Sequence, residues 1–197
     1  MNKQKLIGYF DKQSAERDKW KKRNSYYHQS LEKLCRFLIP EQEQILEIGS
    51  GTGDLLNALE PDRGVGIDVS PKMVEIAQAK YPHLEWQVGD AENLSITEKF
   101  DYIIMSDVLG YLEDVEKSFL SLKKISNEQT RIVVTYYNYL WEPVLRLVEL
   151  LGLKAKQPIQ NWLSPKDIDN LLYLAGFEVI KEGEKMVIIQ NGNQLIL

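Results

Sequence analysis

Short apolar runs alternate along the chain with longer stretches in which apolar residues recur at helical spacing. These short runs predict strands at 45–48, 65–69, 84–88, 100–105 and 131–135, and the strand at 45–48 is expected to be buried. The stretches between them predict amphipathic helices at about 24–39, 54–59, 71–80, 115–125 and 165–175. Strands that alternate with helices along a chain form a parallel sheet with helices on both of its faces.

The remaining pattern completes this α/β arrangement. Segments 177–181 and 185–190 predict a final antiparallel pair of strands. At 197 residues and 44% hydrophobic composition, the chain is long enough to bury one full core. We therefore expect a single, doubly wound α/β domain that covers residues 1–197.

The segment 45–54, ILEIGSGTGD, carries the most informative local pattern. Glycine occupies every second position at Gly49, Gly51 and Gly53, directly after a predicted strand. Glycine tolerates positive φ and has no Cβ, so a ligand can approach the backbone closely. At the carboxyl end of a parallel strand, this pattern predicts a nucleotide-like ligand, with a tight turn that binds no ligand as the alternative.

The acids around these glycines narrow the kind of ligand. In the dinucleotide fingerprint G-x-G-x-x-G, the pyrophosphate lies at a helix N-terminus. Here Asp54 takes the position of the last glycine, where a carboxylate repels phosphate, and Glu47 adds a second negative charge. The two acids favour a cationic ligand without phosphate. S-adenosylmethionine, with its sulfonium and ammonium groups, fits that description.

Acidic residues also follow the next two predicted strands. Asp68 comes 21 positions after Glu47, where a carboxylate accepts hydrogen bonds from ribose hydroxyls. A helix cap is the alternative role for it, but Ser70 and Pro71 already form one. Asp90 is placed to hold an adenine amino group, or else stabilises its own turn.

Together these motifs resemble those of class I, Rossmann-like S-adenosylmethionine-dependent methyltransferases. The family's motif E/D-x-G-x-G-x-G is matched in full at 47–53, and the resemblance covers about residues 40–190. It implies a mostly parallel sheet of seven strands with an antiparallel last pair, S-adenosyl-L-methionine as the cofactor, and methyl transfer as the activity. The cofactor-binding residues that it implies are Glu47, Gly49, Ser50, Gly51, Gly53, Asp68, Val69, Met73, Asp90, Ala91, Ser106 and Asp107.

The resemblance also divides the domain into parts. It implies an N-terminal helical lid segment at 1–39, a cofactor-binding half at 40–135 and a substrate-side half at 136–197. For residues 1–23, a partly disordered tail is the alternative. The substrate-side half contains an inserted amphipathic helix at 140–153, within an unusually long connection. Packing on the core, a lid over an apolar acceptor, a dimer face and a membrane contact all remain open for that helix.

A narrower resemblance concerns the acceptor. Segments 136–143, YYNYLWEP, and 161–164, NWLS, are similar to bacterial methyltransferase modules found next to a glycosyltransferase domain. This similarity implies a small-molecule acceptor, either a saccharide or a lipid-linked glycan, and fusion to a further domain. The apolar end at 194–197 fits either a last strand or a boundary inside a longer polypeptide, and a homodimer also stays open.

Net charge argues against one class of partner. The chain has 29 acidic and 24 basic residues, for a net charge of −5. Nucleic acid is therefore not an expected partner, because phosphate binding needs a positive face. Basic residues do gather at 17–23, around Trp20. A solvated helix face is the first interpretation of this cluster, and an anion-binding edge is the alternative.

Cysteine and histidine usage bounds the chemistry further. Cys35 is the only cysteine, so no internal disulfide can form, and a reducing, cytoplasmic compartment is expected. His28 and His83 are the only histidines, and the sequence predicts neither a metal site nor a transmembrane segment.

The sequence alone does not assign the catalytic residues. Methyl transfer from a sulfonium is an in-line displacement with a neutral leaving group, so alignment of the reactants contributes most. A general base is needed where the acceptor must lose a proton, and Asp107, Tyr136 and Tyr137 are the candidates near the strand ends. Two other functions stay open. One is a non-catalytic module that retains the fold, and the other is an NAD-type Rossmann enzyme, which Asp54 disfavours.

Overall fold

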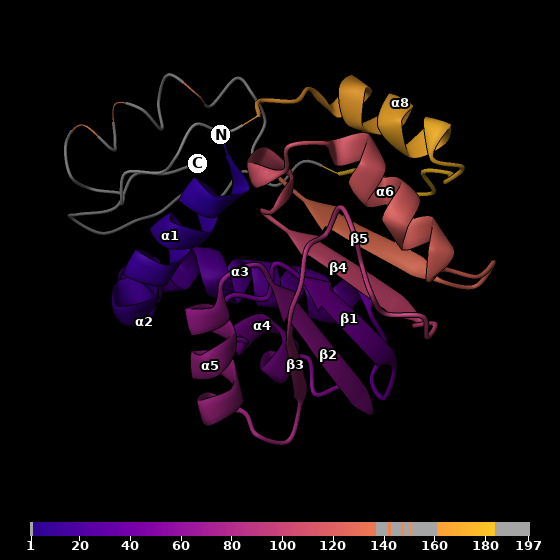
Figure 1. Ribbon diagram of the computed structural model, residues 1–197. Helices are drawn as coiled ribbons and strands as arrows, with labels where there is room; N and C mark the ends of the chain where they lie inside the picture. The colour runs from indigo at the N-terminus through magenta and orange to yellow at the C-terminus, as the bar shows by residue number, and fades with distance from the viewer. Residues whose placement is uncertain (1, 137–141, 143–146, 148–149, 151–160, 184–197) are drawn as a thin grey trace.

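The computed structural model describes residues 2–136, 142, 147, 150 and 161–183, and its centre is a parallel sheet (Figure 1). The strands of this sheet are β1 (Gln44–Ile48), β2 (Arg63–Asp68), β3 (Glu85–Val88), β4 (Tyr102–Ser106) and β5 (Arg131–Thr135). Every neighbouring pair is parallel. The predicted α/β fold with a parallel sheet is confirmed, and the strand bounds lie within about two residues of the predicted ones.

The strand order places a ligand-binding crevice next to the glycine loop. The order is β3-β2-β1-β4-β5, so the chain first builds outward from β1 and then returns to its other side with β4. Ile48 at the end of β1 pairs with Ile67 of β2 and Met105 of β4. In open α/β sheets, ligands bind outside the carboxyl ends of the strands where the order reverses. The carboxyl ends of β1 and β4 therefore mark the expected site.

Helices cover both faces of the sheet, as the sequence predicts (Figure 1). The helices that follow the N-terminal segment are α3 (Ser25–Leu38), α4 (Asp54–Ala58), α5 (Pro71–Lys80), α6 (Val115–Lys124) and α8 (Pro165–Leu174). A short 3₁₀ helix, η2 (Leu109–Tyr111), follows β4. Each of the five predicted helices is confirmed in place. The start of α8 is fixed by a capping box in which Ser164 and Asp167 bond each other's backbone N–H.

The core consists of two apolar clusters, because side chains alternate between the faces of a strand. One cluster joins Leu46 and Ile48 to Phe119 of α6 and Ile168 of α8. On the other side of β1, Ile45 belongs to the second cluster, which is completed by residues of α3 and α4. The two clusters hold the sheet between its helices and so fix the strand ends that carry the site.

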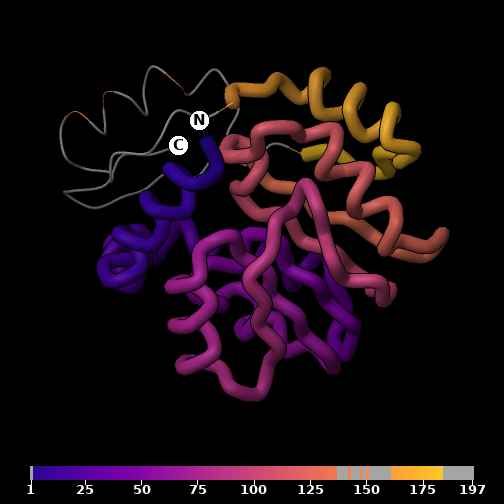
Figure 2. The backbone as a smooth tube through the Cα atoms, in the orientation of Figure 1, coloured from indigo at the N-terminus to yellow at the C-terminus, as the bar shows by residue number. Residues whose placement is uncertain are grey.

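The N-terminal segment is helical and packed. It forms α1 (Lys3–Gln13), the 3₁₀ turn η1 (Ser14–Glu16) and α2 (Arg17–Arg23). Helix α1 contacts α5, and Figure 2 shows the segment at one end of the sheet, away from α6 and α8. The alternative of a partly disordered tail is therefore wrong for residues 2–23, because this segment forms helices that pack against the rest of the domain.

Some predicted elements fall outside the described residues. Glu142, Leu147 and Leu150 are helical, but the other residues of the expected helix at 140–153 are not described. The strand predicted at 177–181 is wrong, because residues 177–183 are described and form no strand. The partner expected at 185–190 lies outside the described part, as do Tyr137 and 194–197. Within the part of the chain that is described, no helix has the length and apolar character needed to cross a membrane.

Candidate functional site

The glycine loop after β1 has the conformation that its sequence demands. Gly49, Gly51 and Gly53 have φ values of +74°, +55° and +81°. The N–H groups of Gly49 and Ser50 both donate to the carbonyl of Ile67, at 2.7 and 3.0 Å. A Cβ on Gly53 would lie 2.4 Å from the Trp86 ring, whereas one on Gly51 would meet nothing within 4 Å. Trp86 therefore fills the space beside Gly53, whereas the space beside Gly51 is free of protein atoms and can accept a ligand.

Asp68 joins this loop to the start of α5. Its two carboxylate oxygens accept the N–H of Gly51 at 2.8 Å and that of Ser70 at 2.9 Å. The Ser70 hydroxyl in turn caps α5 by accepting the N–H of Met73. Burial raises the pKa of Asp68, while these two backbone hydrogen bonds and the charge of Arg17 act to lower it. Asp68 thus organises the loop, and its contact with a ribose stays a prediction.

Glu47 lies beneath the loop, with only 3% of its surface exposed. Its carboxyl group accepts the N–H of Leu56 at 3.2 Å. Burial raises its pKa to about 8, and the charges of Asp68 and Asp54 act in the same direction against that of Lys21. Burial therefore favours the protonated form of Glu47 and acts against the second negative charge that the sequence predicts for it.

Asp54, the other acid of the loop, is fully engaged by protein groups. Its carboxylate accepts hydrogen bonds from Lys21, from Lys80 at 2.6 Å, from Tyr81 at 2.7 Å and from Thr52 at 2.8 Å. Although burial acts to raise its pKa, the charge of Lys21 and these bonds hold the pKa well below its usual range. Asp54 is therefore the anion that fastens α2 and α5 to the start of α4.

The basic residues of α2 divide into two sets. Lys19, Lys22 and Arg23 are exposed, as a solvated helix face predicts. That interpretation is wrong for Lys21, whose side chain is 17% exposed and pairs with Asp54. It is also wrong for Arg17, whose Nε atom is buried. The reason is that one side of α2 packs on the glycine loop.

Helix α1 reaches the ends of β2 and β3. The ammonium group of Lys3 contacts Asp90 at 2.5 Å and Glu92 at 3.2 Å. The Ser70 hydroxyl donates to the carboxylate of Asp11 at 2.6 Å. These contacts lie at the ends of β2 and β3, next to Asp68 and Asp90, which the sequence predicts to bind the adenosine part of the cofactor. The N-terminal segment therefore contacts Asp90 itself as well as the residues around Asp68.

Asp107 follows β4, on the other side of the switch point. Its backbone has φ of +55°, which is uncommon outside glycine and often marks a functional position. The Tyr27 hydroxyl of α3 donates to its carboxylate, and Thr135 lies 3.4 Å from the other oxygen. Ser106 contacts the same Thr135 hydroxyl at 3.2 Å. Side chains of α3, β4 and β5 thus meet at Asp107.

A cavity of about 20 Å³ adjoins Asp107. Asn161 holds its wall in place by donating its N–H to Gly110 at 2.8 Å and its side-chain amide to Leu112. The structure therefore brings the two predicted acceptor segments, at 136 and at 161–163, together with the end of β4. The residues that line the cavity are Asp107, Leu109, Gly110, Tyr136, Asn161, Trp162, Leu163 and Ile168.

The other predicted site residues are mostly buried. Met73 is 2% exposed and Ala91 is 7% exposed, so both belong to the core near the site, and Val69 is half-buried.

His28 of α3 is near the charges of Lys21 and Arg17. Burial and those charges lower its pKa to about 4, so its ring is neutral at pH 7.

Sequence reasoning missed the residues that reach the site from the N-terminal segment. Lys3, Asp11 and Tyr27 have partners about 60 to 90 positions away, so no local pattern could have found them. Only the spacing of Arg17 and Lys21, four positions apart, was a usable signal of a shared helix face. In the described part of the chain, no group of three or more His, Cys, Asp or Glu residues is arranged to hold a metal ion.

Comparison with known proteins agrees with this geometry. A family model described as a methyltransferase domain matches residues 20–182. An uncharacterised methyltransferase of Alkaliphilus oremlandii is 30% identical over 142 residues, which cover 70% of this chain and 65% of that protein. Nodulation protein S of Bradyrhizobium diazoefficiens is 32% identical over 85 residues, 41% of each chain. The chain therefore matches about two fifths to two thirds of the length of these relatives.

A solved structure shows the same fold. The crystal structure of a methyltransferase from Thermotoga maritima, described as S-adenosylmethionine-dependent and a possible histamine N-methyltransferase, has a TM-score of 0.77 and 20% identity. The match covers 98% of this chain and 91% of that one. With the family match over most of the chain, the glycine loop and the switch-point topology, the protein belongs to the class I, Rossmann-like methyltransferases, whose methyl donor is S-adenosyl-L-methionine.

Proposed function

We propose that the protein transfers a methyl group from S-adenosylmethionine to a hydroxyl group of a small molecule, a saccharide or a lipid-linked glycan. The observation that carries this proposal is the position of Asp107. It lies at the switch point, across from the glycine loop, and it lines the cavity that Tyr136, Asn161 and Trp162 share. A carboxylate between a cofactor loop and an acceptor cavity is placed to serve both.

The residues of the loop fit the proposed cofactor. The space beside Gly51 is open, and a Cβ there would meet no atom within 4 Å. In this proposal Asp68 accepts the ribose hydroxyls, Asp90 and Met73 flank the adenine, and the backbone of the loop holds the methionine part. When bound, S-adenosylmethionine supplies a methyl group on a sulfonium, which makes that carbon electrophilic.

The proposed chemistry assigns proton removal to Asp107. Its carboxylate accepts the proton of the acceptor hydroxyl, which makes the oxygen a better nucleophile. The Tyr27 hydroxyl donates to the same carboxylate and so fixes its orientation. Such a base contributes about 10²–10⁴-fold to the rate, and alignment of the acceptor oxygen supplies most of the remainder.

The cavity wall supports a saccharide over a wholly apolar acceptor. Trp162 and Tyr136 provide aromatic surfaces, which pack against the apolar face of a ring, and Asp107 and Asn161 provide polar groups. The cavity of about 20 Å³ has room for the reacting group, and the rest of the acceptor extends outward.

A lone free cysteine suits a reducing compartment, so the proposal places the protein in the cytoplasm.

We also propose that the N-terminal segment 1–39 acts as a lid. Its helices contact the acidic residues after β1, β3 and β4 through Lys21, Lys3 and Tyr27. Lid closure over a bound cofactor excludes water and completes the reaction site. In this arrangement the half at 40–135 binds the cofactor and the half at 136–197 binds the acceptor.

The proposal is tested by methyl transfer to a defined set of acceptors. The protein is incubated with methyl-labelled S-adenosylmethionine and with simple glycosides, polyprenyl-linked sugars, phenols and amines, and products are identified by mass spectrometry. We expect label on a sugar hydroxyl. Asp107→Asn should lower kcat by about 10²–10⁴-fold, a larger effect than its effect on the affinity for S-adenosylhomocysteine.

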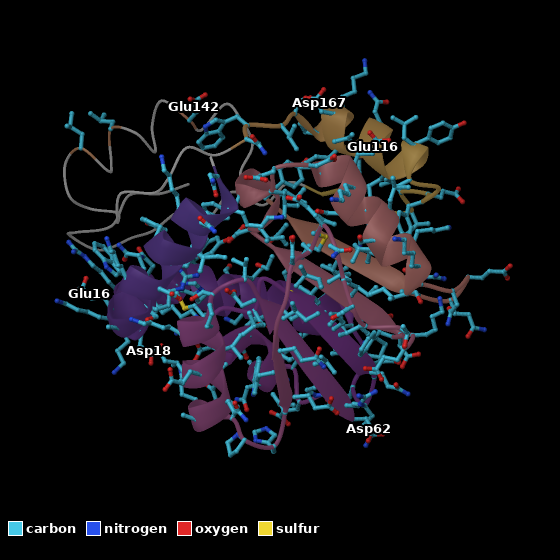
Figure 3. The ribbon with its side chains drawn as sticks, viewed as in Figure 1. Glu16, Asp18, Asp62, Glu116, Glu142 and Asp167 are labelled. Carbon is cyan, nitrogen blue, oxygen red and sulfur yellow. The ribbon has the colours of Figure 1, made fainter. Side chains whose placement is uncertain are left out.

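Asp62→Asn is the matched control for this experiment. Asp62 is exposed and immediately precedes β2, at the end of the sheet opposite the site (Figure 3). Its replacement should leave kcat unchanged. Label on an amine alone would overturn the hydroxyl acceptor, and cofactor binding without turnover on any acceptor would indicate a non-catalytic binding module.

A further inference from the structure

Glu92 is a buried carboxylate outside the glycine loop, in the turn that follows β3. Three acidic residues in the described part of the chain are less than one tenth exposed: Glu47 at 3%, Asp68 at 9% and Glu92 at 5%. Glu47 and Asp68 accept N–H groups of the glycine loop and of the helix starts beside it. The carboxylate of Glu92 instead contacts residues 107–114, which we call the β4–α6 segment. A buried carboxylate needs hydrogen bonds to offset its desolvation, so its partners indicate what it holds in place.

One carboxylate oxygen of Glu92 holds the end of the β4–α6 segment. It accepts the N–H of Glu113 at 2.8 Å and the N–H of Asp114 at 3.3 Å. Asp114 is the N-cap of α6, and negative charge is favourable at a helix N-terminus. The contact is reciprocal, because the Ser121 hydroxyl of α6 donates to the backbone carbonyl of Glu92 at 3.1 Å. The turn after β3 and the start of α6 are therefore joined.

The other carboxylate oxygen joins the same place to the N-terminal segment. It accepts a hydrogen bond from the Lys3 ammonium group at 3.2 Å. Lys3 also contacts Asp90, whose carboxylate accepts the N–H of Glu92 at 3.0 Å. A second contact links α1 to the β4–α6 segment, since the rings of Phe10 and Tyr111 pack edge to face with centroids 5.2 Å apart. Three parts of the chain thus meet at Glu92.

The β4–α6 segment carries one wall of the cavity beside β4. Asp107 and Gly110 line this cavity, and so does Asn161. The carbonyls of Gly110 and Leu112 accept the backbone N–H and the side-chain amide of Asn161. The segment is therefore held by β4 at its start, by Asn161 in its middle and by Glu92 at its end. A reacting group needs a precisely held wall, because small displacements lower the rate.

We infer that Glu92 is a positioning residue for the acceptor. This inference rests on the proposed function, in which the cavity beside Asp107 takes the acceptor. Glu92 acts through the β4–α6 segment and not by contact with the acceptor: it fixes the segment, and with it Asp107 and the cavity wall, in the geometry that methyl transfer needs. Because Lys3 binds the same carboxylate, the N-terminal segment and the acceptor wall are joined through one side chain.

The first test measures how firmly the segment is held. Hydrogen exchange of individual N–H groups is followed by NMR on the full chain. Glu92→Ala removes the acceptor of two N–H groups, so those of Glu113 and Asp114 should exchange about 10- to 100-fold faster. Glu92→Gln keeps the shape and one acceptor oxygen, so exchange there should stay within about fivefold of the wild type. Residues 47–56 should exchange at the wild-type rate in both variants, which shows that the fold is intact.

The second test separates positioning from a purely structural role. Methyl transfer is measured on the glycoside or polyprenyl-linked sugar that takes up most label, and S-adenosylhomocysteine binding is measured by calorimetry. Glu92→Ala should lower kcat/KM for the acceptor by about 10- to 100-fold and change the dissociation constant of S-adenosylhomocysteine less than about threefold. Glu92→Gln should restore kcat/KM to within about threefold of the wild type. A purely structural role would instead weaken both ligands alike.

Two further variants serve as controls. Glu116→Ala removes an exposed glutamate from the first turn of α6 and should leave exchange, turnover and binding unchanged (Figure 3). Lys3→Gln removes the cation and leaves the carboxylate of Glu92 in place. In that variant the N–H groups of Glu113 and Asp114 should exchange within about twofold of the wild-type rate.

The outcomes distinguish this inference from the proposed function. Unchanged exchange at Glu113 and Asp114 in Glu92→Ala, or equal losses for acceptor and S-adenosylhomocysteine, would overturn the inference even if a sugar is methylated. Equally fast exchange in Lys3→Gln would assign the anchor to α1 and would overturn it too. A wild type that methylates no acceptor would overturn the proposed function. The exchange test then decides alone, and faster exchange confined to the β4–α6 segment would support Glu92 as its anchor.

Discussion

Replacement of Glu47 by glutamine tests whether the acid beneath the glycine loop is neutral in the folded protein. Glu47 is 3% exposed, and its carboxyl group accepts the N–H of Leu56 at 3.2 Å. Glutamine has the same shape as a protonated glutamate and can accept the same hydrogen bond. Glu47→Gln therefore removes the titration and keeps the packing.

The size and sign of the effect follow from the pKa of Glu47. Its ordinary value is 4.5, and burial raises it to about 8 in the folded protein. The contribution of this group to stability is therefore fully present below pH 4.5 and is lost as the pH rises toward 8. At about 1.4 kcal/mol per pKa unit, the wild type loses roughly 2–3 kcal/mol through this group between pH 5 and pH 7.

The measurement is urea unfolding of both proteins at pH 5, 6, 7 and 8. All other titrating groups are shared, so the difference in unfolding free energy between the two proteins isolates residue 47. We expect Glu47→Gln to gain stability relative to the wild type by about 2–3 kcal/mol from pH 5 to pH 7. A difference that stays constant with pH, or that favours the wild type at pH 8, would show that Glu47 is ionised in the fold and would refute this reasoning.

Three other predictions concern the same region. Gly53→Ala combines a φ of +81° with a contact of 2.4 Å to Trp86 and should cost ~2–4 kcal/mol in urea unfolding, whereas Gly8→Ala, with no atom within 4 Å, should cost nothing. An equal effect of the two substitutions would contradict this. The pKa of His28 is lowered from 6.5 to about 4, mainly by burial, so its contribution to stability falls as the pH drops between those values. An NMR titration midpoint near 6.5 would refute that shift. Cys35 is 0% exposed, and burial raises its pKa to about 12, so it should resist alkylation in the native protein and react in urea; rapid native labelling would contradict its burial.

Local signals in the sequence predict the fold and the cofactor loop. Glycine at every second position directly after a strand indicates a turn that needs positive φ. The observed φ values of Gly49, Gly51 and Gly53 are all positive. Ser70 with Pro71, and Ser164 with Asp167, predict helix starts because the cap and its partners lie within three residues. Signals of this kind need no knowledge of the rest of the chain.

Long-range pairing is what the sequence could not show. The basic run at 17–23 has the pattern of a solvated helix face, but in the fold Lys21 pairs with Asp54, 33 positions away. Tyr27 and Asp107 are 80 positions apart, and no local sequence pattern around either residue predicts their contact. The sequence does not show the charge of Glu47 for a related reason, because burial shifts its pKa and burial is a property of the whole fold.

The glycine loop and Asp68 are proposed to form the binding site of S-adenosylmethionine. Calorimetric titration with S-adenosylhomocysteine, and with NAD as the competing nucleotide, tests this assignment. We predict micromolar affinity for S-adenosylhomocysteine, no measurable affinity for NAD, and a loss of at least about tenfold in Asp68→Ala, where the ribose contact is removed. Binding of NAD, or an affinity for S-adenosylhomocysteine that Asp68→Ala leaves unchanged, would contradict it.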